Sequence, residues 1–584
     1  MEPLQSDFEE RLDQIAARLE RVERQLSALH GQVPFAFEAG DPEAVEPVEE
    51  SDRTNREGSV TSRTPALIGR SLLVLAGAFA IRSVTEAGTI PPMLGVALGV
   101  AFGALWLWLA DRAARHGDRL SATTHAITAV VVILPLLVEA TVRFKFLAPL
   151  PSAIVLVSSA AAVLALARSC ALPSVVWIGA LGPAVTALAL AFATRNVLLF
   201  ASALFVIAAL SFWAGLHTAA STAGWAVVGI LDVLLLMITA VLLIAPPERS
   251  AALLTPPALI ATLLALVTLS FATFIGSTRR TGRSVRITEI VQGIVATLVG
   301  FGGALAVTHR SGAAALATGV IGLVLAAATY AASFTFIDRI EGRRTSFMFY
   351  TSAALIFTLL GAVSIWHDSA LAIVVSVAAL ATAWIGSRKA RETLSLHATI
   401  YILAAAAVID LDTRLYAALV ARSGPQSAYP PLALWLVLVV AAVFCWLPIA
   451  GHGRTWGAIA PAAKLLVMIV LLGGLEVVVL ALGCRMLAGD GEHPLSGATL
   501  AVVRTALLSI SAVLVPLIAR SPRWREARWL TYPILILAGI KLVAEDVPSG
   551  QTAVLVLSFA LYGGALILAP RLARQSAPSG SSNS

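Results

Sequence analysis

Charged residues are scarce in this chain of 584 residues. They make up 13% of it, against about 25% in an ordinary soluble protein, whereas hydrophobic residues make up 58%. Cysteine is scarcer still, and Cys170, Cys445 and Cys484 match neither a CxxC metal pattern nor an even-numbered disulfide framework. This composition excludes a soluble globular protein and indicates an integral membrane protein whose cysteines serve as small apolar side chains.

Long polar segments are missing after residue 66. The longest stretch between two apolar runs, 411–430, is too short for a soluble catalytic domain. The chain also lacks a P-loop GxxxxGK[ST], an HExxH motif and a GxSxG motif with triad partners. We therefore expect no catalytic residue, no metal and no cofactor, and the balance of the sequence is against an enzyme.

Acidic residues are concentrated at the start of the chain. Residues 1–65 hold 15 Asp and Glu against 7 Arg, so the remainder holds 19 Asp and Glu against 34 Lys and Arg. The basic excess lies in short loops between apolar runs, which is typical of membrane topology rather than of a nucleic-acid surface. We expect the lipid bilayer, and not nucleic acid, to be the partner of this region.

The first 65 residues predict a helix and a linker. Apolar residues recur with alternating spacings of four and three along 8–29: Phe8, Leu12, Ile15, Leu19, Val22, Leu26 and Leu29. This heptad pattern predicts a cytoplasmic coiled-coil helix over 1–30 that supports homo-oligomerisation or docks a cytoplasmic partner, and the alternative is a solitary amphipathic helix. The segment 31–65 is rich in Pro, Gly, Glu and Ser and predicts a disordered acidic linker.

The apolar runs predict an all-α, polytopic membrane domain over 66–570, followed by a disordered tail over 571–584. Eighteen runs are long enough to be membrane spans: 66–82, 90–110, 122–142, 146–168, 172–193, 197–216, 222–244, 254–276, 287–307, 312–334, 346–366, 369–386, 392–410, 431–449, 460–482, 498–519, 528–544 and 551–570. Gly95, Gly99 and Gly103 form a GxxxGxxxG pattern that predicts close helix packing.

Loop charges predict the orientation of these spans. With the N-terminus in the cytoplasm, the inner loops and the tail hold 21 Lys and Arg, whereas the outer loops hold 9. Because membrane proteins carry their excess of Lys and Arg on the cytoplasmic side, both termini are predicted to be cytoplasmic.

The two ends of the membrane domain carry recognisable motifs. The domain opens with IGRSLLVLAGAFAIRSVTEAGTIPP and closes with LAGIKLVAEDVPSGQTAVLVLSFALYGGALILAPRL. In this the chain resembles the bacterial membrane-protein family known as domain of unknown function 2339. The matching residues are Ile68, Gly69, Arg70, Gly77, Glu86, Gly88, Pro91, Lys541, Asp546, Ser558, Phe559 and Gly563, and Leu557 stands where the family has an arginine. The resemblance implies a multi-pass protein of the bacterial inner membrane and brings no established activity.

Ionisable side chains inside predicted spans are candidates for function, because a charge near the bilayer centre costs about 2.5–3.5 kcal/mol on insertion scales. They are Arg70, His125, Glu139, Asp232, Glu289, His397, Lys464, Glu476, Arg504 and Lys541. Arg70, Glu289 and Lys464 lie near the cytoplasmic edge and can extend to water, so structural roles explain them. Asp232 lies near the centre of its span, where it is either a functional carboxyl or a neutral, hydrogen-bonded one.

Four candidates fall in the outer half of the predicted membrane domain: Glu139, Glu476, Arg504 and Lys541. We expect them to line a polar chamber that opens to the periplasm. Two alternatives remain, in which Lys541 pairs with Glu545 on its own helix, or Glu476 pairs with Arg504 across helices. Glu545 and Asp546 are expected at the outer surface.

Asp410 and Asp412 form a D-x-D sequence at a predicted helix end. This spacing suits a divalent ion shared with a diphosphate, so the two residues are weak metal candidates. They are also the basis of one alternative function, that of a membrane transferase acting on a lipid-phosphate substrate.

A transporter or flippase-like protein for an amphipathic or anionic envelope substrate is the hypothesis that the sequence favours most. The substrate-binding candidates are Glu139, Asp232, Glu476, Arg504 and Lys541, with Arg504 and Lys541 on the anion and with Asp232 and Glu476 as proton-linked carboxyls. The second alternative is an assembly scaffold that works through the coil at 8–29.

Overall fold

The computed structural model describes residues 91–216, 218, 222–244, 255–282, 284–337, 344–389, 392–420, 429–447, 459–488, 496–548 and 551–575. All of these belong to the larger of two compact units of the chain, Leu73–Ser584. The predicted coil, the acidic linker and the first predicted span, 66–82, lie outside the described residues. Within them every element is a helix and there is no strand.

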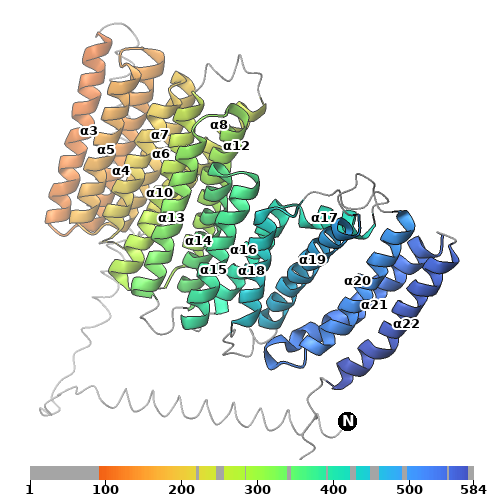
Figure 1. The fold of residues 1–584 in the computed structure, drawn as a ribbon. Coiled ribbons are helices and arrows are strands. Elements are labelled where there is room, and N and C mark those ends of the chain that lie inside the picture. Colours follow the sequence, from red (N-terminus) through yellow and green to blue (C-terminus); the bar gives the residue numbers. More distant parts are fainter. Residues whose placement is uncertain are drawn as a thin grey trace, which may run out of the picture. The chain divides into compact units, whose positions relative to one another are not determined.

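Helices follow one another along the described chain, joined by short connections (Figure 1). The α-helices are α3 (Pro92–Arg115), α4 (Arg119–Val138), α5 (Pro149–Ser169), α6 (Pro173–Thr194), α7 (Val197–Gly215), α8 (Ala223–Ile244), α10 (Pro256–Thr281), α11 (Ile287–Ala296), α12 (Gly303–Ser311), α13 (Ala315–Ala332), α14 (Arg344–Ile365), α15 (Asp368–Lys389), α16 (Glu392–Val408), α17 (Leu411–Leu419), α18 (Leu432–Trp446), α19 (Ile459–Ala488), α20 (Gly497–Ile518), α21 (Thr531–Lys541) and α22 (Thr552–Gln575). Four π-helical turns, η1 (Glu139–Arg143), η2 (Thr297–Gly302), η3 (Ser333–Ile337) and η5 (Leu542–Asp546), and the 3-10 helix η4 (Pro522–Leu530) continue or join them.

Local sequence explains where several helices begin and end. Four α-helices of the described residues begin at a proline, which lacks the backbone N–H that a first helical turn leaves unpaired: α3, α5, α6 and α10. Asp118 and Ser496 cap α4 and α20 through their side-chain oxygens. Gly282 and Gly312 end α10 and α12 with φ of 61° and 66°, a left-handed conformation that glycine adopts without strain.

Small residues allow close helix packing. A Cβ atom on Gly319 of α13 would lie 2.8 Å from the carbonyl oxygen of Gly361 on α14, so the two backbones touch. The predicted packing role is confirmed for two glycines of the GxxxGxxxG pattern, because a Cβ on Gly99 or Gly103 would meet Leu136 or Ile133 of α4 at less than 2.5 Å.

Two hydrophobic cores fill the described domain. The first is built from α3 to α14 and contains Phe271, Phe274 and Phe357. The second is built from α14 to α22 and contains Tyr401 and Phe444. Helix α14 contributes to both cores and thus connects them.

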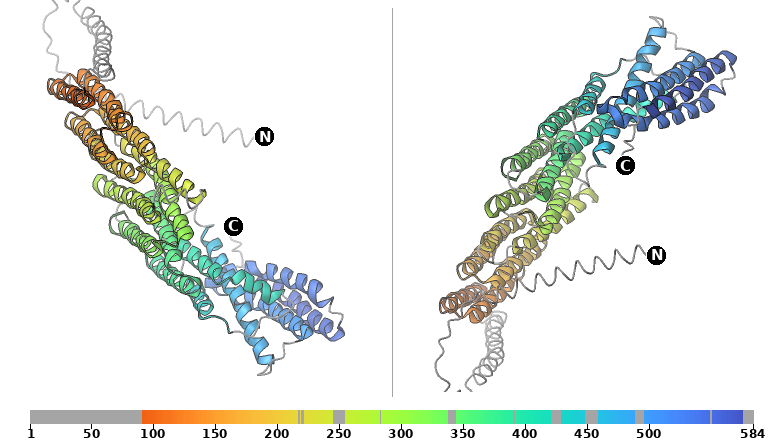
Figure 2. Two further views of the ribbon diagram at one scale, coloured as in Figure 1. Left: turned by 90° about the horizontal axis from the view of Figure 1, so that it is seen from above. Right: turned by 90° about the horizontal axis from the view of Figure 1, so that it is seen from below.

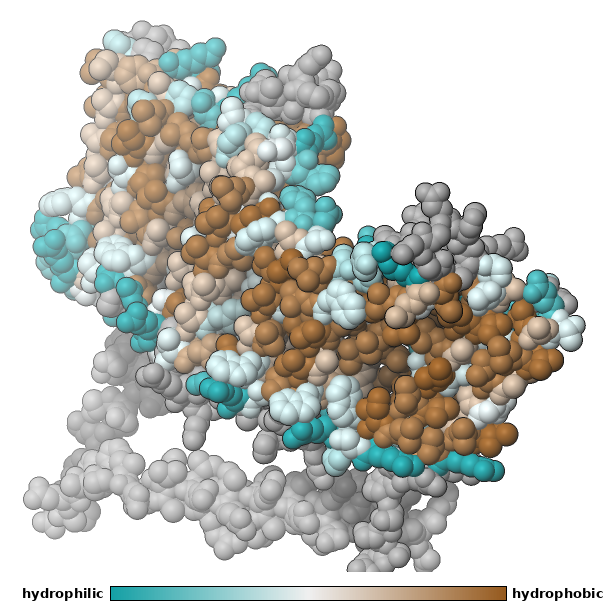
Figure 3. All heavy atoms as spheres, viewed as in Figure 1, coloured by the Kyte–Doolittle hydropathy of each residue, from teal (hydrophilic) through white to brown (hydrophobic). Residues whose placement is uncertain are grey.

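Apolar side chains also cover much of the outside. On the face seen in Figure 3, hydrophobic residues cover the helices along much of their length, and hydrophilic residues gather near the helix ends. Among the described residues, arginines at helix ends lie over aromatic rings in seven pairs: Arg112 over Trp108, Arg143 over Phe144, Arg168 over Trp213, Arg388 over Trp384, Arg485 over Tyr429, Arg523 over Trp446 and Arg528 over Trp529. An apolar belt flanked by arginine and aromatic residues is typical of a membrane-embedded protein.

Fifteen helices in the described part of the chain are long and apolar enough to cross a membrane. A sixteenth crossing results if α16 and α17 are one broken span, and α18 is a shorter apolar helix. Every predicted span after the first coincides with one of these helices. The all-helical, multi-pass fold is therefore confirmed, whereas the count of eighteen spans and the cytoplasmic orientation remain predictions.

Two boundaries differ from the sequence prediction. The predicted span 392–410 is followed by α17, and α16 and α17 meet at an angle of 60° around Asp410, whose φ of 52° is left-handed. Helix α22 continues to Gln575, five residues into the predicted tail. Hydropathy alone did not indicate α17, because 411–430 contains Asp412, Arg414 and Arg422 and was predicted as a connection between two spans.

Candidate functional site

The last three α-helices, α20 to α22, form a bundle with three buried charged side chains, Arg504, Lys541 and Asp546. They lie side by side in both views of Figure 2, and α20 packs extensively on α22 and α21 but more sparsely on α19. We call this part, residues 496–575, the C-terminal bundle. Its contacts with α17 and α19 are where the candidate site lies.

Helix α20 presents three polar residues to its neighbours. Arg504 and Thr505 are fully buried, and Ser511 lies seven residues further along. Seven residues are close to two helical turns, so Ser511 is on the same face as Arg504 and about 10 Å along the axis. One helix thus carries polar contacts at two depths.

A π-helical turn, η5, follows α21 and places two carboxylates beside Lys541. Val547 donates its backbone N–H to the carbonyl of Leu542, five residues earlier, at 3.0 Å. In an α-helix, residues five apart are about 140° apart around the axis. The π turn instead brings Asp546 almost above Lys541, and their side chains pair at 2.5 Å.

Lys541 uses all three of its ammonium protons inside the bundle. It donates to Asp546 Oδ1, to Thr505 Oγ1 at 2.6 Å and to the carbonyl of Ala501. Thr505 in turn donates to Asp546 Oδ2 at 2.6 Å. Because an ammonium group has three donors, this set is complete without a further ligand.

Arg504 connects the bundle to α17, the second helix of the bent pair α16–α17. Its Nη1 donates to Glu545 Oε1 at 2.8 Å, and its Nη2 donates to the carbonyl of Ala417 in the last turn of α17 at 3.3 Å. The carbonyl end of a helix is partially negative, which favours a cation there. Glu545 also lies 3.5 Å from Lys541, so two cations and two carboxylates form one electrically neutral network.

The position expected for Asp546 was wrong. The sequence places Glu545 and Asp546 at the outer surface, but Asp546 is fully buried and the Glu545 side chain is only 28% exposed. The π turn explains the difference, since it rotates Asp546 toward Lys541 instead of toward solvent. We call Arg504, Thr505, Lys541, Glu545 and Asp546 the ion-pair network.

Glu476 does not pair with Arg504. Its Oε1 accepts from the hydroxyl of Ser511 at 2.5 Å, while its other carboxylate oxygen is buried and has no hydrogen-bond partner. Glu476 belongs to α19, so this contact joins α19 to the C-terminal bundle. A buried carboxylate with one oxygen that lacks a hydrogen bond destabilises the folded protein, so Glu476 is a candidate for proton binding.

A third polar contact lies near the start of α19. Lys464 lies 3.2 Å from Glu526 of η4 and donates to the carbonyl of Arg523. Twelve residues separate Lys464 from Glu476, which is about 18 Å along a helix. The contacts of Lys464, Glu476 and Arg504 therefore follow the boundary of the bundle over about 28 Å, close to the thickness of a hydrocarbon core.

We call these three contacts the polar seam: Lys464–Glu526, Glu476–Ser511 and Arg504–Ala417. Its two ends are held by buried charges and its middle by a single carboxyl. Packing between α19 and α20 is otherwise sparse for neighbouring helices. The seam thus adds polar contacts at two ends and the middle of an interface that lies inside an apolar domain.

The other two binding candidates lie in the first core. Asp232 of α8 is buried and accepts from Gln292 of α11 at 2.5 Å, and its Oδ1 has no hydrogen-bond partner. Glu139 begins η1 at the end of α4 and is half-buried. The structure therefore places Arg504 and Lys541 in one network with Glu476 nearby, but it does not place Glu139 or Asp232 with them.

The remaining ionisable candidates occupy structural positions. The buried His397 and Tyr401 of α16 both contact the hydroxyl of the half-buried Tyr330 of α13, at 3.2 and 3.3 Å. Glu289 accepts from the backbone N–H of Arg286 at the start of α11. His125 lies against Trp106 with 5.0 Å between ring centroids, and Arg70 lies outside the described residues.

Asp410 and Asp412 are exposed at the bend between α16 and α17. Asp410 occupies the N-terminal end of α17 without capping it through its side chain. No group of three or more His, Cys, Asp and Glu residues in the described ranges is arranged to hold a metal ion. The D-x-D sequence therefore gains no further ligand from its surroundings there.

Sequence reasoning missed the uncharged members of the site. Thr505, Ser511 and Gln292 each hydrogen-bond a charged side chain, but none differs in the sequence from an ordinary packing residue. The spacing of Arg504 and Ser511 was the one available signal, because it places both on one face of α20.

No family model matches the chain, and no curated protein matches it. The resemblance to the domain of unknown function 2339 family thus stays a prediction that rests on the two end motifs.

Proposed function

We propose that the protein transports an amphipathic anionic molecule across the bacterial inner membrane, with the anionic head group following the polar seam. The observation that supports this most is the extent of the seam. Its contacts span about 28 Å, so a polar group moving between α19 and the C-terminal bundle would meet polar partners through most of the apolar layer.

Arg504 is the residue to which we assign the anion. Its partner Glu545 is the one partly exposed member of the ion-pair network, and an incoming phosphate or carboxylate could replace it with similar charge compensation. Lys541 has a different role, because its three protons already bind groups inside the bundle. We therefore assign Lys541 to positioning η5.

Glu476 is the carboxyl that we assign to proton coupling. It lies between the two charged ends of the seam, and one of its oxygens has no hydrogen-bond partner. Asp232 lies in the first core, so we do not assign it a role in the seam. The broken span α16–α17 supports the same proposal, since discontinuous helices line substrate sites in many secondary transporters.

Movement of a fluorescent lipid tests this function. Full-length protein is reconstituted into liposomes that contain NBD-labelled phosphatidylglycerol, and dithionite then bleaches every label that reaches the outer leaflet. We expect wild-type protein to expose inner-leaflet label, and Glu476→Gln to slow this by about tenfold, or about 1.4 kcal/mol of barrier. Asp412→Asn, a matched change of an exposed carboxylate, should keep the wild-type rate.

Two results would count against the proposal. One is bleaching no faster or more complete than in protein-free liposomes. The other is equal movement of NBD-labelled phosphatidylglycerol and of a zwitterionic phosphatidylethanolamine, because Arg504 should favour the anion.

A further inference from the structure

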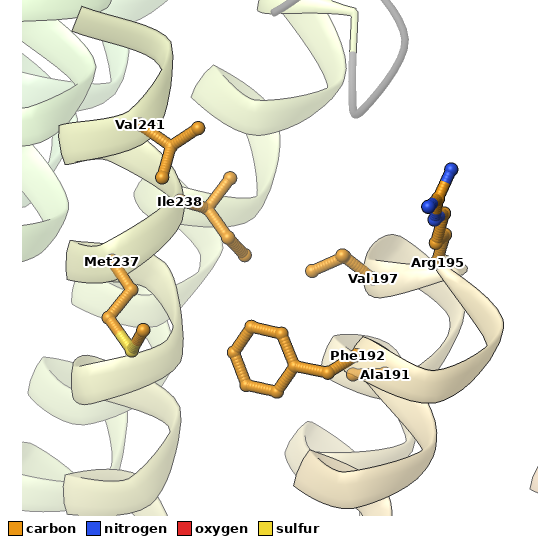
Figure 4. A pocket seen from close by; sticks show the side chains of 7 residues that line it. All are labelled: Ala191, Phe192, Arg195, Val197, Met237, Ile238 and Val241. Carbon is orange, nitrogen blue, oxygen red and sulfur yellow. The ribbon is translucent and has the colours of Figure 1, made fainter. Parts of the chain in front are cut away.

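A hydrophobic groove lies in the first core, away from the polar seam. Its cavity volume is about 90 Å³, and it is lined by Ala191, Phe192, Arg195, Val197, Met237, Ile238 and Val241. Figure 4 shows side chains of α8 on one side and those around the end of α6 on the other, facing one another across it. Ala191, Val197 and Ile238 are buried, whereas the remaining side chains are exposed.

The groove faces the apolar surroundings of the helices. Phe192 and Met237 are each 48% exposed and Val241 is 42% exposed, so its rim is hydrophobic and open. An apolar cavity is a poor site for water and a good one for hydrocarbon. Because these helices are membrane-embedded, the hydrocarbon available to fill the groove is a lipid acyl chain.

One charged side chain stands at the end of this apolar lining. Arg195 follows directly after α6, and Figure 4 shows its guanidinium directed away from the apolar side chains. The groove thus combines an apolar slot with positive charge where helices end, which is the arrangement of a phospholipid tail and its phosphate.

We propose that this groove binds one anionic phospholipid, with an acyl chain between α6 and α8 and its phosphate on Arg195. Guanidinium groups suit this task because they bind phosphate oxygens through two parallel N–H donors. Under the predicted orientation the lipid belongs to the outer leaflet, since α6 and α8 end on the periplasmic side. The site does not depend on transport along the seam.

Native mass spectrometry of the full-length protein with added palmitoyl-oleoyl phosphatidylglycerol tests the site. We expect wild-type protein to retain one such lipid more tightly than palmitoyl-oleoyl phosphatidylcholine. Arg195→Gln should weaken this binding by about tenfold, in line with the loss of charge-assisted hydrogen bonds. Arg388→Gln, which changes another exposed arginine at a helix end, should bind as the wild type does.

A second variant tests the slot itself. Val241→Phe adds an apolar ring at an exposed rim position, so the protein should fold normally while the ring occupies the space of the acyl chain. We expect it to lose the tightly held lipid although Arg195 is intact. If the protein retained phosphatidylglycerol and phosphatidylcholine equally, the bound lipid would be non-specific annular lipid, and this result would overturn the proposal. Unchanged binding in Arg195→Gln or in Val241→Phe would also overturn it.

Discussion

Replacing Asp546 by asparagine removes one of the two carboxylates in the ion-pair network and preserves the shape of the side chain. Asp546 is fully buried and accepts from both Lys541 and Thr505. The substitution leaves the Lys541 ammonium with Glu545 at 3.5 Å as its remaining anionic partner. Asp546→Asn therefore tests whether the buried charges of the ion-pair network stabilise one another.

The expected loss follows from the contacts that remain. Breaking a buried pair by removing one partner costs about 3–5 kcal/mol. Lys541 retains its contacts with Glu545, Thr505 and the carbonyl of Ala501. We therefore expect a loss of stability at the lower end of this range, about 3 kcal/mol. Removing both charges with Lys541→Met and Asp546→Leu should recover most of this loss, since it leaves no unpaired buried charge.

Amide hydrogen exchange in lipid nanodiscs measures this loss locally. If the free energy of local opening of η5 falls by about 3 kcal/mol, its backbone amides exchange roughly 100-fold faster. Asp412→Asn serves as the control because its carboxylate is exposed. Exchange in Asp546→Asn that matches the control would refute the view that the network holds η5.

Two further predictions concern packing and hydrogen bonding. Gly319→Ala should destabilise the α13–α14 contact by about 1–3 kcal/mol, because its Cβ would lie 2.8 Å from the carbonyl oxygen of Gly361. Gly229→Ala meets no atom within 4 Å and should leave the thermal unfolding midpoint unchanged or higher, so equal midpoints for the two variants would contradict this account. Tyr330→Phe removes the hydroxyl that contacts both His397 and Tyr401 and should lower the local stability of α13 and α16 by about 1–3 kcal/mol. Faster amide exchange in these two helices would show this loss. Unaltered exchange there would mean that the Tyr330 hydroxyl does not stabilise them.

The membrane helices could be predicted from the sequence because each apolar run is long and continuous. The alternation of spans also predicted which charges share an end of the domain. Lys464 of α19 and Glu526 of η4 lie in segments that this alternation places at the same end, and they do meet. Arg504 and Glu545 were placed together at the opposite end, and they meet there.

Pairing between individual side chains could not be predicted. Choosing Glu545 over Glu476 as the partner of Arg504 requires the rotation of α20 against α19 and α21, which hydropathy does not fix. The burial of Asp546 depends on a π turn, and no residue of 542–546 marks such a turn. The single chamber expected for Glu139, Glu476, Arg504 and Lys541 also failed to form, because Glu139 is near the first core and the other three are near the second.

Locking the polar seam tests the central claim most directly. In a variant in which Cys170, Cys445 and Cys484 are replaced by serine, Lys464→Cys and Glu526→Cys place two thiols where the side chains now meet. A short bifunctional methanethiosulfonate can then join α19 to η4, and dithiothreitol can release it. We predict that the locked protein stops moving NBD-labelled phosphatidylglycerol and that reduction restores movement. Movement at the same rate before and after locking would contradict transport along the seam.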